Sequence, residues 1–319
     1  MSRLFRDVDG GRLAPRGTVV CIGAFDGLHL GHRALIGRAV ARARALGVDA
    51  CVLSFEPLPR EYFAPAGATP ARLTWPRKKI ATLIDAGADL IGLLRFDARL
   101  AALSATDFVR RVLVDRLGAC EVWTGEDFRF GRGRAGDAAL LAQLGPELGF
   151  RSRVLEPVQV DGARVSSSRI RELLAAGDFQ RAAALLGRPY TMTGRVTRGT
   201  RLGRKLGYRT ANLGLRGRTP ALSGIFAARV HGVAATPWPA VASLGTRPTV
   251  QGGAPVLEAH LFGFDGDLYG RLIEVEFVAR LRGEERFPDL ESLVAQMDRD
   301  AAEARSVLGL EPTQRGAAA

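Results

Sequence analysis

The sequence predicts an α/β domain with a Rossmann-like parallel sheet, followed by a small antiparallel β-barrel and a C-terminal helix. Strand-like and helix-like segments alternate with short links as far as residue 187, which is typical of a parallel sheet covered by helices on both faces. Beyond that point, short segments rich in β-formers alternate with glycine turns, which favours a barrel or a sandwich. We therefore expect two domains, residues 1–187 and 188–319.

The first domain is expected to alternate short buried strands with helices. Apolar runs predict buried strands at residues 18–23, 50–55, 90–96 and 120–125. Helices are expected at residues 32–46, 77–88 and, as a pair ending at Gly187 and Pro189, 168–190. Ser104 followed by Asp107 resembles an N-cap with an acid at the third helical position, so another helix is expected from Ala105 onward.

The second domain contains five segments typical of strands. They span residues 190–196, 224–230, 240–245, 257–264 and 271–281. One amphipathic helix is expected over residues 289–309, with an apolar side formed by Leu290, Leu293, Val294 and Met297. The tail that follows this helix is expected to be loose.

The composition is that of an ordinary globular protein with excess positive charge. Of 319 residues, 47% are hydrophobic, and no apolar run reaches the roughly 20 residues that span a bilayer. The N-terminal segment has no apolar core like that of a secretory signal, and three widely spaced cysteines suggest neither disulfides nor zinc. We therefore expect a cytoplasmic protein with no membrane partner. The net charge of +12 favours a bias towards arginine, with a nucleic-acid surface or an anionic ligand such as a nucleotide phosphate as alternatives.

The segment GAFDGLHLGHRAL, residues 23–35, contains His29 and His32, two of the four histidines of the chain. A strand is expected to end at Gly23 and a helix to begin near Gly31. Ligands bind beyond the carboxyl ends of parallel strands, and a helix N-terminus offers N–H groups to a phosphate. Both histidines could donate to phosphate oxygens in such a pocket. A zinc half-site and a chance pair on a surface helix are the alternatives.

The segment ARVSSSRIREL, residues 163–173, has three serines directly before a predicted helix, with arginines around them. One serine is expected to be an ordinary N-cap. A capped helix start with arginine neighbours is also a cradle for phosphate, so both interpretations can hold together.

In the second domain, GTRLGRKLGYRTANL, residues 199–213, is glycine-rich and basic. Such a loop can fold over phosphates with its backbone N–H groups. Thr210 and Asn212 alternate with Ala211, so on a strand they would face the same way and could both reach one Mg²⁺. An ordinary basic hairpin turn is the alternative.

Glu258 and His260 are expected on one face of a strand whose other face carries apolar residues. A carboxylate at the mouth of a barrel is a candidate base for deprotonating an alcohol. A solvent-facing Glu–His pair fits the same pattern, and the segment alone leaves both interpretations open.

These motifs together resemble a known family. GAFDGLHLGH resembles the His-x-Gly-His signature of the nucleotidyltransferase superfamily, and VSSSRIR resembles its partner motif. With FEPLPREYF (55–63) and TGEDFRFGRGRAGD (124–137), they are similar to the adenylyltransferase half of the bifunctional bacterial riboflavin kinase/FAD synthetases. The motifs RTAN, SLGTRPTV (243–250), DLYG and RLRGEERF (280–287) resemble the riboflavin kinase module. The likeness covers residues 15–310.

For the first domain, the resemblance implies an FMN adenylyltransferase that uses ATP. His29 and His32 would contact ATP phosphates, and Asp127 would lie at the flavin and nucleotide pocket. The other residues implied at the ATP site are Gly23, Phe25, Asp26, Arg164, Ser167, Ser168 and Arg171. Leu58 stands where many relatives have histidine, so no catalytic role is assigned to it.

For the second domain, the resemblance implies a riboflavin kinase. Thr210 and Asn212 would bind Mg²⁺–ATP, and Glu258 would activate the 5′-hydroxyl of riboflavin. The ATP loop is expected to include Gly199 and Gly203. The chain departs from the family's Pro-Thr-Ala-Asn by placing Arg209 before the threonine, which frees the backbone and adds a charge near phosphate.

We therefore expect a flavin-forming enzyme that converts riboflavin to FMN and FMN to FAD, with ATP, riboflavin and FMN as partners and Mg²⁺ as cofactor. No nucleic-acid partner is expected, and self-association is left open. An adenylyltransferase acting on another phosphorylated substrate would leave the barrel unexplained. A basic nucleic-acid-binding protein is the alternative from a different class.

Overall fold

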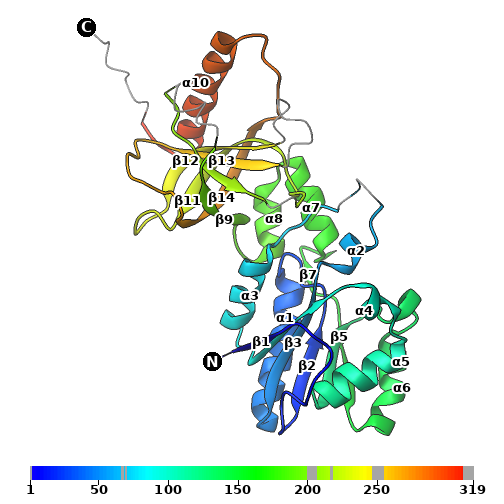
Figure 1. Ribbon diagram of the computed structural model, residues 1–319. Coiled ribbons are helices and arrows are strands. Elements are labelled where there is room, and N and C mark those ends of the chain that lie inside the picture. The colour runs from blue at the N-terminus through cyan, green and yellow to red at the C-terminus, as the bar shows by residue number, and fades with distance from the viewer. Residues whose placement is uncertain are drawn as a thin grey trace. The chain divides into compact units, whose positions relative to one another are not determined.

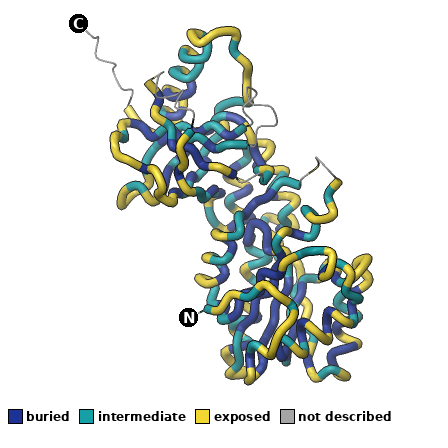
Figure 2. Tube along the Cα trace, viewed as in Figure 1, coloured by how far each residue is buried: buried dark blue, intermediate teal, exposed yellow. Residues whose placement is uncertain are grey.

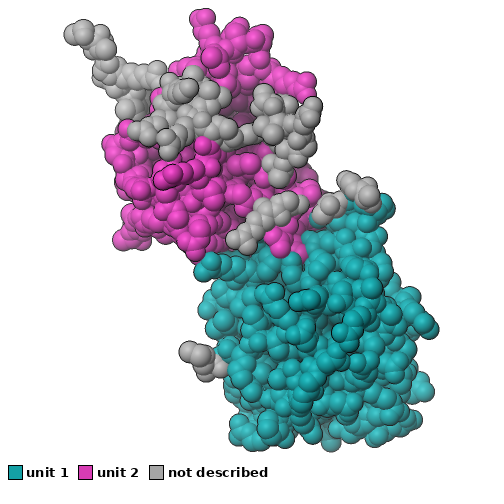
Figure 3. All heavy atoms as spheres, in the orientation of Figure 1, with its two compact units in different colours: residues 1–70, 74–167 teal, residues 71–73, 168–319 magenta. Residues whose placement is uncertain are grey.

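The protein is described by a computed structural model, which covers residues 2–65, 68, 70–199, 207–215, 218–245 and 255–311. The chain forms two compact units (Figure 3). The first unit comprises residues 1–70 and 74–167, and the second comprises residues 71–73 and 168–319. The domain boundary expected at residue 187 stays a prediction, because this division reflects compactness and not independent folding.

The first unit is built on a six-stranded sheet in which every neighbouring pair is parallel. The sheet order is β1-β4-β3-β2-β5-β6. Its strands are β1 (Arg3–Phe5), β2 (Thr18–Ile22), β3 (Asp49–Glu56), β4 (Leu90–Arg95), β5 (Ala119–Gly125) and β6 (Arg151–Leu155). The predicted parallel α/β domain is thus confirmed, and the inner strands β2, β3, β4 and β5 are largely buried (Figure 2).

Helices cover both faces of this sheet (Figure 1). They are α1 (Leu30–Leu46), α2 (Pro59–Tyr62), α3 (Pro76–Asp85), α4 (Ala98–Ala102), α5 (Ala105–Asp107) with its π-helical continuation (Phe108–Arg116), and α6 (Ala138–Leu148). Alternate residues of β2 enter different cores: Val19 packs with α1 and α3, and Val20 with the π-helical segment and α6. Ser104 caps α5 as predicted, because its Oγ accepts from Asp107 N at 3.0 Å.

The second unit contains a closed barrel of six antiparallel strands in the order β10-β13-β12-β11-β14-β9. The strands are β9 (Thr191–Thr197), β10 (Ala211–Gly214), β11 (Gly224–His231), β12 (Trp238–Gly245), β13 (Val256–Leu261) and β14 (Leu272–Arg282). Along β13, Leu257, Ala259 and Leu261 are buried and the residues between them are less so. The closed order of the strands confirms the barrel prediction, and the alternation along β13 shows which of its faces is turned to the core.

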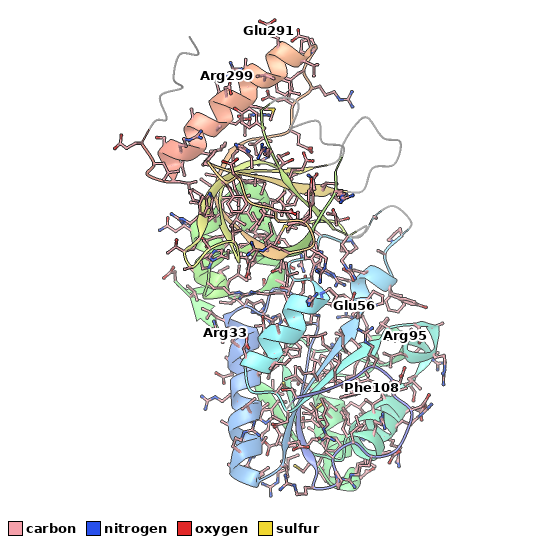
Figure 4. All side chains as sticks on the ribbon, turned by 60° about the vertical axis from the view of Figure 1, so that its left-hand side comes forward. Arg33, Glu56, Arg95, Phe108, Glu291 and Arg299 are labelled. Carbon is pink, nitrogen blue, oxygen red and sulfur yellow. The ribbon has the colours of Figure 1, made fainter. Side chains whose placement is uncertain are left out.

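The C-terminal helix α10 (Leu290–Val307) begins at its N-cap Asp289 and packs against the barrel (Figure 4 labels its residues Glu291 and Arg299). Its buried contacts come from Ala301 and Ala304. Leu290, expected on the apolar side, is 58% exposed, because the packed surface lies nearer the C-terminal end of the helix. The expected loose tail falls largely on residues 312–319, outside the described residues. Among the described residues, no helix has the length and apolar character needed to cross a bilayer.

The predicted pair of helices before the barrel is present as α7 (Ser167–Ala176) and α8 (Phe179–Leu186). Phe179 of α8 places its ring 5.9 Å from that of Phe226 and 6.2 Å from that of Phe277, both on barrel strands. Residues Ala71–Leu73 also belong to this unit, and Arg72 N donates to Thr219 O at 2.9 Å. The folded surroundings of the barrel therefore extend well beyond its six strands.

Removing α7 and α8 should destabilise the barrel. We expect a fragment of residues 168–319 to unfold at least about 5 °C above a fragment of residues 188–319, because deleting one buried phenylalanine alone costs about 3 kcal/mol. Thermal unfolding followed by circular dichroism measures the difference. Equal midpoints would show that α8 contributes nothing to the barrel.

Candidate active sites

A pocket of about 460 Å³ opens in the first unit where three parallel strands end. Gly23 follows β2, Gly125 ends β5 and Leu155 ends β6, and all three line the pocket. The first turn of α1 supplies another part of the lining. This is the position at which open α/β sheets bind ligands.

His29 and His32 both line this pocket, as the sequence predicted for one shared site. His29 is the N-cap of α1, and its Nδ1 accepts a hydrogen bond from His32 N at 3.3 Å. The two rings stack with centroids 3.6 Å apart. Because Nδ1 of His29 accepts, Nε2 is the ring nitrogen whose proton is available to a ligand. Arg33, on the same turn, is exposed (Figure 4).

His32 is held as a neutral ring. Its pKa lies well below 6.5, first because the ring is desolvated and then because His29 and Lys79 are close. Its Nδ1 is buried and has no hydrogen-bond partner in the described part of the chain. Near neutral pH the His32 ring is therefore uncharged and can donate one N–H group to a ligand.

The turn between β2 and α1 has an unusual backbone. Phe25, Gly27 and Leu28 have φ of +47°, +91° and +47°, a region that residues with a side chain rarely enter. Gly27 N donates to Thr74 Oγ1 at 3.0 Å. Glycine suits this position because it has no Cβ to oppose the positive φ.

Asp26 holds this turn in place. Its side chain is 3% exposed, and its carboxylate accepts from Arg60 Nη2 at 2.6 Å and from Thr74 N at 2.9 Å. Among the residues expected at the ATP site, Phe25 lines the pocket and Asp26 does not. The Asp26 carboxylate thus shapes the pocket indirectly, by holding the backbone of the turn that carries Phe25.

The far wall of the pocket comes from Asp127, Arg164 and Ser167. Arg164 pairs with Asp127, and Ser167 Oγ donates to Asp26 O at 2.8 Å. Three of the residues expected here thus meet around one cavity. Ser166 lines it as well, although sequence analysis did not single out this serine from its neighbours.

Ser168 and Arg171 do not line this pocket. Both belong to the second unit, where Ser168 is exposed and Arg171 Nε donates to Ala71 O at 2.8 Å. Leu58 is buried and caps α2 without a side-chain hydrogen bond. Residues 156–158, the loop after β6, also line the pocket. Sequence analysis did not predict this loop, because the charged sequence of β6 has no apolar run that would identify it as a strand.

A second pocket, of about 230 Å³, lies in the second unit and is lined by Gly199, Thr210 and Asn212. Asn212 Nδ2 donates to Thr210 Oγ1 at 3.3 Å, so these side chains meet as predicted. Thr210, however, precedes β10 and is not within it. A Cβ on Gly199 would lie 2.7 Å from Asn212 Oδ1, so a larger residue there would require the Asn212 side chain to move. Gly203 lies outside the described residues.

The donor set of this pocket suits Mg²⁺. A threonine hydroxyl and an asparagine carbonyl are hard oxygen ligands, and Mg²⁺ takes few protein ligands because phosphates and water complete its octahedron. Over the described residues, no group of three or more His, Cys, Asp or Glu side chains is arranged to hold a metal ion.

Glu258 lies on β13 directly opposite Asn212 of β10 and Ser243 of β12. Directly opposed residues share one face of a sheet, so its carboxylate projects on the same side as the Asn212 side chain. Glu258 and His260 share the less buried face of the strand, as predicted. Glu258 does not line the pocket of Thr210 and Asn212, although it is their neighbour in the sheet.

His260 has a distinct position. Its Nδ1 donates to Arg209 O at 2.9 Å, and burial is the main cause that lowers its pKa. It therefore fixes the backbone just before Thr210 as a neutral ring, a role that sequence analysis missed. Arg209 Nη1 lies 3.2 Å from Asp265 Oδ1 in an exposed pair, which contributes little to stability.

The fold and the two pockets define a two-unit transferase with a nucleotidyltransferase-like α/β unit and a kinase-like barrel. Residues 12–169 match the family model described as FAD synthetase, and residues 186–308 match the model described as riboflavin kinase. The chain belongs to the bifunctional riboflavin kinase/FMN adenylyltransferase family.

Full-length relatives bear these names. A bifunctional riboflavin kinase/FMN adenylyltransferase of Pseudomonas fluorescens is 45% identical over 96% of this chain and 97% of its own length. The Escherichia coli K12 protein of the same name is 42% identical over 97% of this chain and 98% of its own length. A crystal structure from Streptococcus pneumoniae, described as a macrolide-efflux protein, has a TM-score of 0.77 at 28% identity and covers 95% of this chain and 98% of that one.

The depressed pKa of His32 should make stability depend on pH. In the unfolded chain His32 takes up a proton near its ordinary pKa of 6.5, whereas the folded chain does not. The unfolded state therefore binds more protons below pH 6.5, and stability falls as the solution is acidified. We expect the stability advantage of the wild type over His32→Gln to shrink from pH 8 to pH 5 in urea unfolding. A constant difference would contradict a depressed pKa.

Proposed function

We propose that the barrel transfers the γ-phosphoryl group of ATP to riboflavin, giving FMN, and that the first unit joins FMN to AMP from a second ATP. The observation that carries this proposal is that each unit has its own pocket with groups suited to phosphate, the histidine pair in one and Thr210–Asn212 in the other. Two separate pockets match two successive reactions. Each family model also covers one of them.

In the first unit, an oxygen of the FMN phosphate attacks the α-phosphorus of ATP in line, and pyrophosphate leaves. His29 Nε2–H and the N–H groups at the start of α1 donate to phosphate oxygens as negative charge builds on them. No protein nucleophile is needed, because positioning and charge stabilisation supply the acceleration. Because the pKa of His32 is depressed by burial, its ring donates to phosphate as a neutral group near neutral pH.

The triphosphate requires further groups on its other side. Arg164 is well placed, since it lines the pocket and its present partner Asp127 also lines it. A triphosphate would compete with Asp127 for the guanidinium, which pairs with phosphate in a bidentate manner. Ser167 would hold the main chain of the turn through its hydrogen bond to Asp26 O, while Arg164 binds the triphosphate. Roles for Ser168 and Arg171 at the same triphosphate stay part of the proposal.

In the barrel, Glu258 takes the proton of the riboflavin 5′-hydroxyl as that oxygen attacks the γ-phosphorus, and ADP leaves. Thr210 Oγ1 and Asn212 Oδ1 are the proposed ligands of Mg²⁺, which neutralises phosphate charge. Gly199 allows Asn212 to lie against the main chain. His260 holds the carbonyl of Arg209 and so fixes the approach to Thr210.

A chromatographic assay tests the function and separates the two sites. Wild-type protein incubated with riboflavin, ATP and Mg²⁺ should give FMN and then FAD. We expect His29→Ala to lower FAD formation by about 100- to 1,000-fold, the effect of losing one transition-state hydrogen bond, while FMN still forms. Glu258→Ala should fail to phosphorylate riboflavin and still convert added FMN to FAD.

Each of these two variants is the control for the other. Loss of both activities in either folded variant would contradict the assignment of separate sites. Failure of the wild type to make any flavin nucleotide, together with salt-sensitive binding to oligonucleotides, would support the nucleic-acid alternative.

Replacing Asn212 with alanine should weaken metal binding. We expect the Mg²⁺ concentration for half-maximal FMN formation to rise about tenfold or more, in line with the loss of a group at a metal site. A Mg²⁺ titration of kinase activity gives the measurement, and His231→Gln on β11, which pairs with Glu276, is the control. Lost activity with an unchanged Mg²⁺ requirement would assign Asn212 another role.

A further inference from the structure

Lys79 is a buried cation next to the turn that carries the histidine pair, and the proposed mechanism does not use it. It lies on α3 and is 0% exposed. Its Nζ donates to Ala24 O at 2.7 Å and to Ser54 Oγ at 3.2 Å. Ser54 Oγ in turn donates to the same Ala24 O at 3.1 Å. One carbonyl therefore accepts two hydrogen bonds, from side chains on α3 and β3.

The choice of lysine at this position is informative. All but three of the 45 basic residues of the chain are arginine, so a lysine here departs from the bias of the sequence. Lysine ends in a compact charge on a slim stem, whereas arginine ends in a broad planar fork. A slim stem suits a fully buried side chain that must bring one ammonium to one carbonyl. Burying a charge is unfavourable, so stability alone would favour an apolar residue at this position.

The anchored carbonyl directly precedes Phe25, whose φ of +47° is unusual for a residue with a side chain. The Phe25 ring meets the His32 ring edge-on, with centroids 5.2 Å apart. His32 in turn stacks on His29. A continuous set of contacts thus runs from Lys79 through Ala24 and Phe25 to both histidines.

We propose that Lys79 is a positioning residue for adenylyl transfer: with Ser54 it clamps the Ala24 carbonyl, holds Phe25 in its left-handed conformation and so fixes the orientation of the two histidine rings. The inference rests on the function proposed for this pocket. The Lys79 charge also lowers the pKa of His32, which places the two groups within electrostatic reach of each other.

The first test is Lys79→Met in the full-length chain, which keeps the stem and removes the ammonium. We expect kcat for FAD formation to fall by about 10- to 100-fold, because a displacement of about 1 Å at a reacting group can cost 100-fold. KM for FMN and ATP should stay near the wild-type values. Phosphorylation of riboflavin by the same molecules should be unchanged and so reports on folding.

Arg77→Met is the matched control. Arg77 lies on the same helix, is exposed, and loses the same charge on substitution. We expect this variant to keep both activities. A fall in FAD formation equal to that of Lys79→Met would assign the effect to net charge and overturn the proposal.

Ser54→Ala gives an independent test if Lys79→Met fails to fold. It removes the second donor to the same carbonyl, so kcat for FAD formation should fall by a smaller factor with kinase activity intact. Because both side chains act through one carbonyl, the double variant should lose much less than the product of the two single effects. The proposal would be overturned if the fold-loss in kcat of the double variant equalled the product of the two single losses, or if kcat of Ser54→Ala were unchanged.

A spectroscopic readout separates positioning from loss of stability. In the wild type and in Arg77→Met, nuclear Overhauser contacts between the Phe25 and His32 rings should be present, and in Lys79→Met or Ser54→Ala they should weaken. Unchanged ring contacts, or equal loss of both activities, would count against the role of Lys79. A wild type that forms no FAD would instead contradict the proposed function.

Discussion

The turn between β2 and α1 is the constraint on which the first site depends, because its backbone is strained and must be held from outside. Phe25, Gly27 and Leu28 all have positive φ, and such conformations persist only where the surroundings over-determine them. Side chains from β3, α2, α3 and the start of α7, together with Thr74, meet the turn at Ala24, Asp26 and Gly27. The helix start and its capping histidine follow from this turn, so the rest of the pocket inherits its geometry.

Part of the positive charge of the chain is paired within the fold. Arginines pair with carboxylates throughout both units, and Arg282 forms two hydrogen bonds to Asp300 at 2.8 and 2.7 Å. Pairs of this kind hold these guanidinium groups against their own unit, so that they are not free to contact a polyanion directly. They favour the interpretation of the +12 charge as a compositional bias, as the sequence analysis preferred.

Sequence patterns identified the elements with strong periodicity and missed those without it. Strands β2 to β5 carry apolar runs and were predicted, whereas β1 has three residues and β6 reads RSRVL, which gives no buried pattern. His29 and His32 line one pocket, as expected from the sequence, and Thr210 and Asn212 line the other. The role of Asp26 could not be predicted, because its partners Arg60 and Thr74 are distant in the sequence and only the fold reveals them. The same holds for His260 and the Arg209 carbonyl.

The assignment of Ala71–Leu73 to the second unit has a topological consequence. The stretch is flanked on both sides by residues of the first unit, so the chain passes from one unit to the other, back again, and then finally onward. No single cleavage of the polypeptide can release both units whole. If the gene were divided at any one point, at least one of the two products would lack a segment that its compact unit contains in the full-length chain.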